Sequence, residues 1–167
     1  MTTFSDMVNM LGGVPVASGL GLVGLAGGKW YFCDPTHGSA SNDGLTPATA
    51  KASLSACYDL TRSGYNDGVI FMGGATAFNP AAAFDWSNNY CHLIGASSST
   101  LGKGQRCRVV ALSATTLTQA MTISGSGCVI SNIQWNNEKP TGAASGSLTV
   151  TGLRNRFDNC FFPVLIL

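Results

Sequence analysis

Residues 128–135, Cys-Val-Ile-Ser-Asn-Ile-Gln-Trp, and residues 155–162, Asn-Arg-Phe-Asp-Asn-Cys-Phe-Phe, share one pattern of apolar and polar positions. The alignment pairs Ile130 with Phe157, Ser131 with Asp158, Asn132 with Asn159, and Ile133 with Cys160. Both copies end in a large aromatic residue. Their offset of 27 residues (155 − 128) falls within the range of roughly 20–50 residues that is typical of stacked repeats. The pattern therefore predicts strands that stack on one another.

The composition favours a β-rich domain. A chain of 167 residues can form one domain with a sizeable core, or one domain with an arm. Only 10% of the residues are charged, against about 25% in an ordinary soluble domain, and the 21 glycines favour turns and strands over helices. The net charge of +1 provides no electrostatic attraction to nucleic acid, so we expect no nucleic-acid partner.

The cysteines indicate a reducing environment. Six of them lie at positions 33, 57, 91, 107, 128 and 160, and none form a CxxC pair, which argues against a zinc or redox motif. Most lie within apolar, strand-like runs. Buried reduced thiols that act as small hydrophobic side chains are the expected state, and this favours folding in a reducing cytoplasm.

Residues 1–28 differ from the rest of the chain, because no charged residue occurs from Met7 to Gly28. The glycines at 19, 21 and 24 match a dinucleotide fingerprint, but the flanking sequence lacks the strand and helix that this motif needs. A membrane-spanning or membrane-active segment over 8–28 is a weaker alternative, since glycines lower its hydrophobicity. We favour an extended arm that orders against a partner. The expected anchoring residues are Val14, Val16, Leu20, Leu22, Val23 and Leu25.

The next segment alternates strands, loops and one helix. Residues 29–34 predict an aromatic strand, and residues 68–73 predict an apolar strand between glycines. Residues 53–63 predict a helix with a buried stripe, with Ser53 or Ser55 as its cap and Gly64 at its end. The predicted stripe consists of Leu54, Cys57, Tyr58 and Thr61. Residues 79–87 are interpreted as a loop or a short helical turn.

After residue 90 the sequence predicts only short strands joined by turn-forming residues. The predicted strands are Tyr90–Gly95, Arg106–Leu112, Ala120–Ser124, Cys128–Trp135, Ser147–Thr151 and Arg156–Phe162. In the earlier polar loop, a cation shared by Asp34, Asn42 and Asp43 is the less favoured interpretation. Hydrogen bonds from these side chains to their own loop are more common. We expect no metal and no cofactor.

The segments Trp30–Pro35, Asn42–Gly44, 53–63 and Val69–Gly74 together resemble the N-terminal module of pectate-lyase-like β-helix proteins. The resemblance implies an all-β right-handed parallel β-helix whose open end is capped by the helix at 53–63. It also implies that Asn132 and Asn159 form a structural ladder along the stack. Two departures are Asn66-Asp67-Gly68 in place of a Gly-Asp pair, and Gly73-Gly74 in place of a Pro-Gly turn.

The expected organisation has three parts. Residues 1–28 form the anchoring arm, residues 29–89 form the N-terminal module with its capping helix, and residues 90–167 form the first coils of the β-helix. The apolar residues 163–167 lack a polar cap, which solenoids need at their ends. We therefore expect the coils to continue beyond residue 167, and burial of this end against partner subunits is the alternative.

The acidic residues do not suggest an active site. Only eight occur, and no pair of carboxylates suited to acid–base catalysis can be assembled, so we expect no catalytic residue here. The resemblance and the uncharged arm favour a phage virion protein, made in the host cytoplasm, that is attached through residues 1–28 to capsid or tail proteins. Family precedent implies a homotrimer, and a host surface glycan is a further candidate partner. The alternatives are a polysaccharide depolymerase with its active face outside this segment, and a secreted or membrane-tethered adhesin.

Overall fold

The computed structural model describes residues 10–11, 14–15, 28–80, 82–97, 107–111, 120–137 and 148–162. This part of the chain consists mainly of strands in parallel sheets, with one short α-helix, α2 (Leu54–Tyr58), and one 3-10 turn, η1 (Pro47–Thr49). Two further strands, β1 (Met10–Leu11) and β2 (Val14–Pro15), pair antiparallel with each other. The described chain is therefore of the all-β type.

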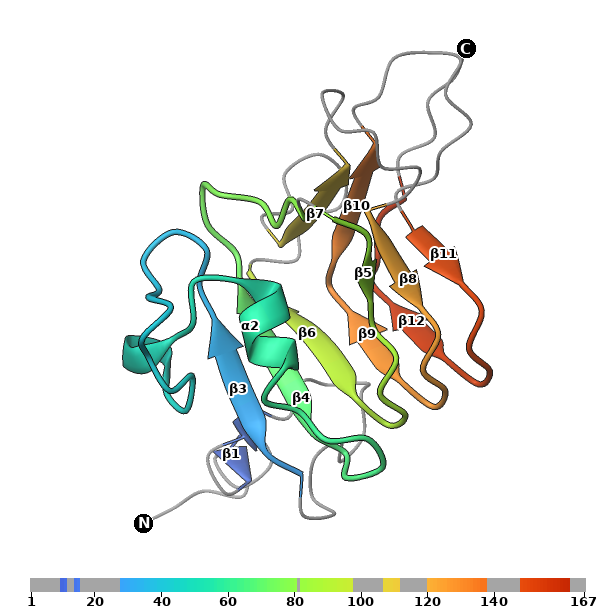
Figure 1. The fold of residues 1–167 in the computed structure, drawn as a ribbon, viewed down its shortest axis with the longest axis horizontal. Helices are drawn as coiled ribbons and strands as arrows, with labels where there is room; N and C mark the ends of the chain where they lie inside the picture. Colours follow the sequence, from blue (N-terminus) through green and yellow to red (C-terminus); the bar gives the residue numbers. More distant parts are fainter. Residues whose placement is uncertain are drawn as a thin grey trace.

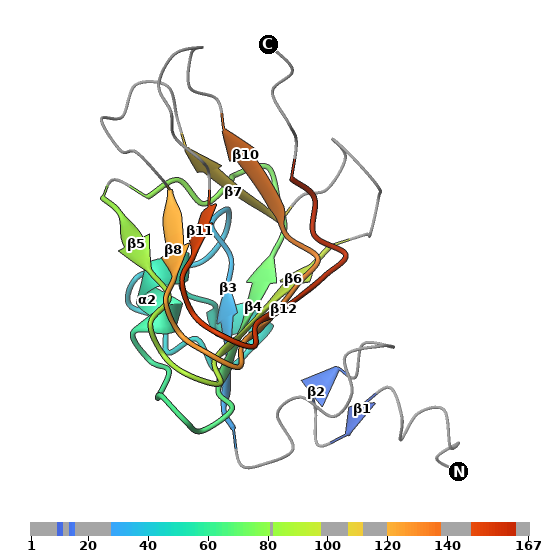
Figure 2. The ribbon, with the colours of Figure 1, turned by 90° about the vertical axis from the view of Figure 1, so that its right-hand side faces the viewer.

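Three parallel sheets surround one interior (Figures 1 and 2). The five-stranded sheet has the order β12-β9-β6-β4-β3. Its strands are β3 (Trp30–Cys33), β4 (Gly68–Met72), β6 (His92–Ala96), β9 (Val129–Ser131) and β12 (Arg156–Asp158). The three-stranded sheet contains β5 (Phe84–Asp85), β8 (Met121–Ile123) and β11 (Leu148–Val150). The third sheet pairs β7 (Arg108–Ala111) with β10 (Gln134–Asn137).

From β6 onward the chain visits these sheets in one order. It passes from the five-stranded sheet to the β7–β10 sheet, then to the three-stranded sheet, and then back to the five-stranded sheet. Before β6 the order differs, because β3 leads through η1 and α2 to β4, and β4 leads through β5 to β6. Each return pairs a strand with the one from the previous circuit, so Gly68 lies beside His92, Leu93 beside Ile130, and Ile130 beside Phe157. The offsets are 24, 37 and 27 residues. The last offset confirms the register predicted from the two aligned segments.

Inward-facing side chains from all three sheets form one apolar core. In the five-stranded sheet, alternate residues point inward, as the two-residue period of a strand requires. Tyr31, Val69, Leu93 and Ile130 lie on that inner side and belong to the core. Val109 and Trp135 enter the core from the β7–β10 sheet, and Met121 and Ile123 enter it from the three-stranded sheet.

Two predicted strands are shorter than expected because an asparagine turns the chain. Asn132 has a φ of 58° and separates β9 from β10, so the predicted strand Cys128–Trp135 is wrong as a single element. Asn159 has a φ of 48° and ends β12, where the prediction extended to Phe162. A residue in the left-handed region cannot continue a strand, and asparagine tolerates this region better than most residues. Both asparagines therefore redirect the chain from one sheet toward the next.

A second corner repeats before each later strand of the five-stranded sheet. Asn66, Tyr90, Gly127 and Arg154 all have a positive φ, of 56°, 52°, 72° and 57° respectively. Each lies two residues before the first residue of β4, β6, β9 or β12. Only one of the four is glycine, so the stacked corner imposes this conformation on tyrosine and arginine as well.

The prediction of a helix over 53–63 is wrong in its length, because α2 ends at Tyr58. Its start is confirmed, since the Ser53 Oγ accepts a hydrogen bond from the Ala56 N–H at 3.2 Å. After Tyr58 the Thr61 N–H donates to the Tyr58 carbonyl at 2.8 Å, which tightens the turn and releases the chain from the helix. Thr61 of the predicted stripe is buried as expected, although it lies outside the helix.

Residues 79–87 contain a strand where the sequence indicated a loop or a helical turn. Phe84 and Asp85 form β5 and pair with Met121 and Thr122 of β8. The strand has two residues, and its partner lies 37 residues further along the chain (121 − 84). Such a short strand carries no period of its own, so it is defined only by its partner.

Candidate functional site

Of the six predicted anchoring residues, the structure describes one, Val14, which pairs with Leu11 between β2 and β1. Val14 lies in β2, and the other five lie outside the described residues: Val16, Leu20, Leu22, Val23 and Leu25. Across the described part of the chain, no helix has the length and hydropathy needed to cross a membrane.

Asn132 and Asn159 are brought together, as the aligned segments suggested. The Asn159 Nδ2 donates to the Asn132 Oδ1 at 3.1 Å. The Asn132 Nδ2 in turn donates to the Gly95 carbonyl at 2.7 Å and to the Ser97 carbonyl at 3.1 Å. The two amides thus connect three successive strands at one corner. These hydrogen bonds lie within the stack, as the predicted structural ladder requires.

The acidic loop near β3 binds its own backbone. The Asp34 Oδ1 accepts from the Thr36 and His37 N–H groups at 2.8 and 3.1 Å, and the His37 ring lies 3.2 Å from the Asp34 Oδ2. Burial alone would raise the pKa of Asp34, but these hydrogen bonds outweigh burial and lower it. Asp43 accepts from the Leu45 N–H at 3.0 Å. In the segments that the structure describes, no group of three or more His, Cys, Asp or Glu residues is arranged to hold a metal ion.

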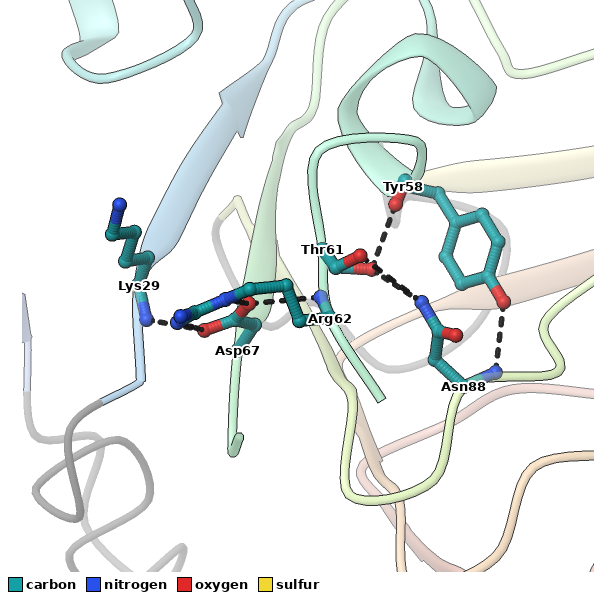
Figure 3. A network of polar contacts seen from close by, with 6 residues as sticks. All are labelled: Lys29, Tyr58, Thr61, Arg62, Asp67 and Asn88. Carbon is teal, nitrogen blue, oxygen red and sulfur yellow. Dashed lines mark hydrogen bonds and ion pairs between the residues drawn. The ribbon is translucent and has the colours of Figure 1, made fainter. Parts of the chain in front are cut away.

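The strongest polar centre is one that the sequence did not suggest (Figure 3). The Asp67 carboxylate is fully buried and forms an ion pair with Arg62, with an Nη2–Oδ1 distance of 2.8 Å. It also accepts from the Arg62 Nε and N–H groups, both at 2.9 Å, and from the Lys29 N–H at 2.7 Å. Asp67 therefore joins the start of β3, the segment after α2, and the start of β4.

Electrostatics keep this carboxylate ionised. Burial by itself would raise the pKa of Asp67, but the hydrogen bonds from Arg62 and from the Lys29 N–H outweigh it and lower the pKa below its usual value. The Arg62 guanidinium also stacks over the Tyr65 ring, 4.2 Å from its centroid, and its own pKa is raised by its hydrogen bond to Asp67. The sequence signal that could have indicated this site is the position of Asp67, a single carboxylate directly before the uncharged strand β4.

A second network lies beside the first. The Tyr58 hydroxyl accepts from the N–H groups of Ser87 and Asn88 at 2.7 and 2.8 Å. The Asn88 Nδ2 donates to the Thr61 Oγ1 at 3.0 Å (Figure 3). The last residue of α2 is thereby bonded to the corner that leads into β6. In both networks the Asp67 carboxylate and the Tyr58 hydroxyl accept hydrogen bonds from groups of the same chain, as is typical of buried polar groups that hold a fold together.

His92 is a titratable group in an unusual environment. Its side chain is buried on β6, its ring stacks on Trp30, and its Nδ1 accepts from the Val129 N–H at 3.1 Å. Desolvation by burial lowers the pKa of His92 to about 4, so the ring is neutral at pH 7. A neutral ring is required for Nδ1 to act as an acceptor.

One depression of about 410 Å³ lies beside α2. Its lining includes Pro35, Ser53, Ser55, Phe78 and Phe84. Every residue that lines it is uncharged and none is His, Cys or Tyr, so this depression contains no side chain that can exchange a proton near neutral pH. Its chemistry suits a small neutral ligand better than an acid–base reaction.

No protein-family model matches this chain, and no curated protein is significantly similar to it.

Proposed function

We propose that the described coils are the start of a right-handed parallel β-helix. The order in which the chain visits the three sheets from β6 to β12 supports this, together with parallel pairing in register at each return to the five-stranded sheet. Right-handed crossovers are the rule for parallel strands that share a sheet. Stacking of this kind buries one continuous core with few charged residues, consistent with a chain that is only 10% charged.

In this proposal α2 caps the first coil. Leu54, Cys57 and Tyr58 are buried and join the core, and the helix lies against β3 and β4. The three-stranded sheet ends at β5, its edge strand, and has no further strand to lie across from β3. Without α2, the inner side chains of β3 and β4 would therefore face solvent. An amphipathic helix is a standard way to cover the open end of a stack.

The function supported best is that of a structural appendage protein of a phage virion, attached to capsid or tail proteins through residues 1–28. One observation carries the proposal: an uncharged, glycine-rich segment leads directly into β3, the edge strand of a stacked parallel sheet. A stiff stack with an apolar leader suits a protein that is anchored at one end and projects from a particle. Virion localisation, a homotrimeric state and a host surface glycan as a partner belong to the same proposal.

The test is incorporation into particles. Deletion of residues 2–28 should abolish incorporation, while the Asp85→Asn variant of the full chain, changed at an exposed side chain, should be incorporated normally. Circular dichroism of the deleted protein checks that its strands still form. Normal incorporation of the folded, deleted protein would overturn the proposal.

Two assays address the other classes of function. Release of reducing sugar from host capsule by the complete protein would assign a depolymerase instead. Recovery of the 1–28 segment, fused to a soluble reporter, in the membrane fraction would assign a membrane-tethered adhesin. We expect neither result.

A further inference from the structure

Two cysteines that are 24 residues apart in the sequence (57 − 33) meet beneath α2. Cys33 is the last residue of β3, Cys57 lies in α2, and the helix packs against the strand (Figure 1). The Cys57 Sγ donates to the Phe32 carbonyl at 3.1 Å, which places it against the backbone next to Cys33. The two thiols are also hydrogen-bonded to each other. The fold thus assembles a pair of thiols that no CxxC motif indicates.

The two thiols of this pair differ in acidity, as a nucleophile and its second thiol must. The hydrogen bond from Cys33 stabilises the thiolate form of Cys57 and lowers its pKa, and the Lys51 N–H contributes to this. The same hydrogen bond, together with burial, raises the pKa of Cys33, which therefore keeps its proton. Because the thiolate is the reactive form, Cys57 acts as the nucleophile and Cys33 as the thiol that attacks second.

The other four cysteines, all in described segments, carry no such activation. Burial raises the pKa of each of their thiols, to about 12 for Cys91. Cys91 and Cys128 directly precede β6 and β9, whose pairing places them side by side. Both pKa values are raised, so neither thiol of this second pair is a good nucleophile near neutral pH. These two cysteines therefore provide a matched comparison within the same core.

Solvent comes close to the segments that carry the 33–57 pair. The depression beside α2 is lined by Pro35, two residues after Cys33, and by Ser55, two residues before Cys57. The helix itself has five residues, and a helix this short gains little stability from its own hydrogen bonds. Local opening of one turn is enough to admit a molecule of the size of water. A small uncharged oxidant can therefore reach Cys57 from this side.

We propose that Cys33 and Cys57 are a site of oxidation by hydrogen peroxide, and that the resulting disulfide locks α2 onto β3. The Cys57 thiolate attacks one peroxide oxygen and the O–O bond breaks, which leaves a sulfenic acid on Cys57. The released hydroxide takes up the proton that Cys57 has lost and forms water. The Cys33 sulfur then attacks the Cys57 Sγ, and the S–O bond breaks. The departing hydroxide takes the Cys33 proton, so two thiols are oxidised while one peroxide is reduced to two waters.

The disulfide should stabilise the part of the fold that α2 covers. It closes a loop of 24 residues and so restricts the unfolded chain, which raises the Tm of the oxidised protein by roughly 5–10 °C. A protein made with reduced thiols would gain this lock after it meets an oxidant. The inference goes beyond the proposed attachment to a particle and does not depend on it, since every readout below uses the isolated protein.

Mass spectrometry of the native, full-length protein after treatment with hydrogen peroxide tests the proposal. Trypsin places the two cysteines on separate peptides, 30–51 and 52–62. Without reductant, these peptides should be recovered joined, with the loss of two hydrogen atoms. Recovery of the two peptides unjoined, or a predominant bond between other cysteines, would overturn the proposal. A joined protein whose Tm has not risen would overturn the locking of α2.

Serine variants test the two roles. In Cys33→Ser the sulfenic acid on Cys57 has no thiol to attack it, so dimedone should label Cys57. In Cys57→Ser, dimedone should label Cys33 at least tenfold less, and equal labelling would contradict the assigned roles. The matched control Cys128→Ser should still form the 33–57 bond. Oxidation of the wild-type chain in urea should lose the preference for this bond, because Cys91 and Cys107 are closer in sequence. The same preference in urea would show that the fold does not create the site.

Discussion

The segment from β3 to the start of β4 and the strands from β6 to β12 are held together by different kinds of contact. In the first region, single side chains join distant segments, as Asp67 does with Arg62 and the Lys29 N–H. In the second region, the same backbone corners recur from one circuit to the next: a residue with positive φ precedes β6, β9 and β12, and an asparagine with positive φ follows β9 and β12. A region held by unique contacts fails when one residue is lost, whereas a repeated contact distributes the loss.

The largest effect should come from Asp67→Ala. It leaves Arg62 without its carboxylate partner, and removes the acceptor for the N–H groups of Lys29 and Arg62. The Arg62 side chain is 41% exposed and can be hydrated, so the cost comes mainly from the two N–H groups left without an acceptor, and is about 3 kcal/mol in the free energy of unfolding. Urea unfolding followed by circular dichroism measures this cost. The control Asp85→Ala, at an exposed side chain bonded to the Ser124 Oγ, should change stability by about 0.5 kcal/mol or less.

Acidification should lower the free energy of unfolding through His92, which lies on β6 at the start of the second region. The pKa of His92 is about 4 in the folded state and near 6.5 in the unfolded state, so the unfolded chain binds more protons between these values. Stability is therefore complete above pH 6.5 and falls by up to roughly 3 kcal/mol as the pH decreases through 4. Urea unfolding at a series of pH values tests this, and His92→Gln should flatten the slope.

Asp67 acts in a lower pH range. Its folded pKa is lowered, so its contribution is present above the usual carboxyl pKa of 3.8 and is lost as the pH falls below that value. In Asp67→Asn, the decrease between pH 6.5 and 4 should therefore persist. Loss of that decrease would assign it to the carboxylate rather than to the histidine.

The asparagine pair should tolerate substitution better than Asp67. Asn132→Ala removes hydrogen bonds to the Gly95 and Ser97 carbonyls and places alanine at a φ of 58°, which together cost about 2 kcal/mol. Asn132→Gly keeps the conformation accessible, so it should cost about 1 kcal/mol. Asn159→Ala, at an exposed position in the last described circuit, should cost about 1 kcal/mol. A cost for Asn132→Ala as large as that for Asp67→Ala would remove the distinction between the two regions.

Two substitutions at the positive-φ corner should have opposite signs, and the second of them should be the smallest effect of all. Gly127→Ala should destabilise by about 1–2 kcal/mol, because its φ is 72° and an added Cβ would lie 2.7 Å from the Tyr90 ring. Arg154→Asn should stabilise by about 0.5 kcal/mol, since Arg154 is exposed at a φ of 57° and asparagine adopts this conformation more readily. Thermal unfolding of both variants tests the two signs, and a loss of stability in Arg154→Asn would show that its side chain has a role in the fold.

The sequence by itself determined those strands and pairings in which residues of neighbouring circuits occupy equivalent positions. The pairing of Ile130 with Phe157, the strand at 30–33 and the Ser53 cap were all readable, because each depends on a local pattern or on one short offset. The other three offsets, of 38, 24 and 37 residues (68 − 30, 92 − 68 and 130 − 93), differ because the connections differ in length, and this conceals the repeat from any search for a fixed period.

Only the tertiary structure decided where elements end and which distant side chains meet. The helix ends at Tyr58, where the Tyr58 hydroxyl accepts from the N–H groups of Ser87 and Asn88, and Thr61 accepts from the Asn88 side chain. The strand β5 forms because β8 lies beside it. The meeting of Asp67 with the Lys29 N–H likewise requires β3 and β4 to be paired first. Contacts of this kind join residues that are far apart in the sequence, so no local pattern specifies them.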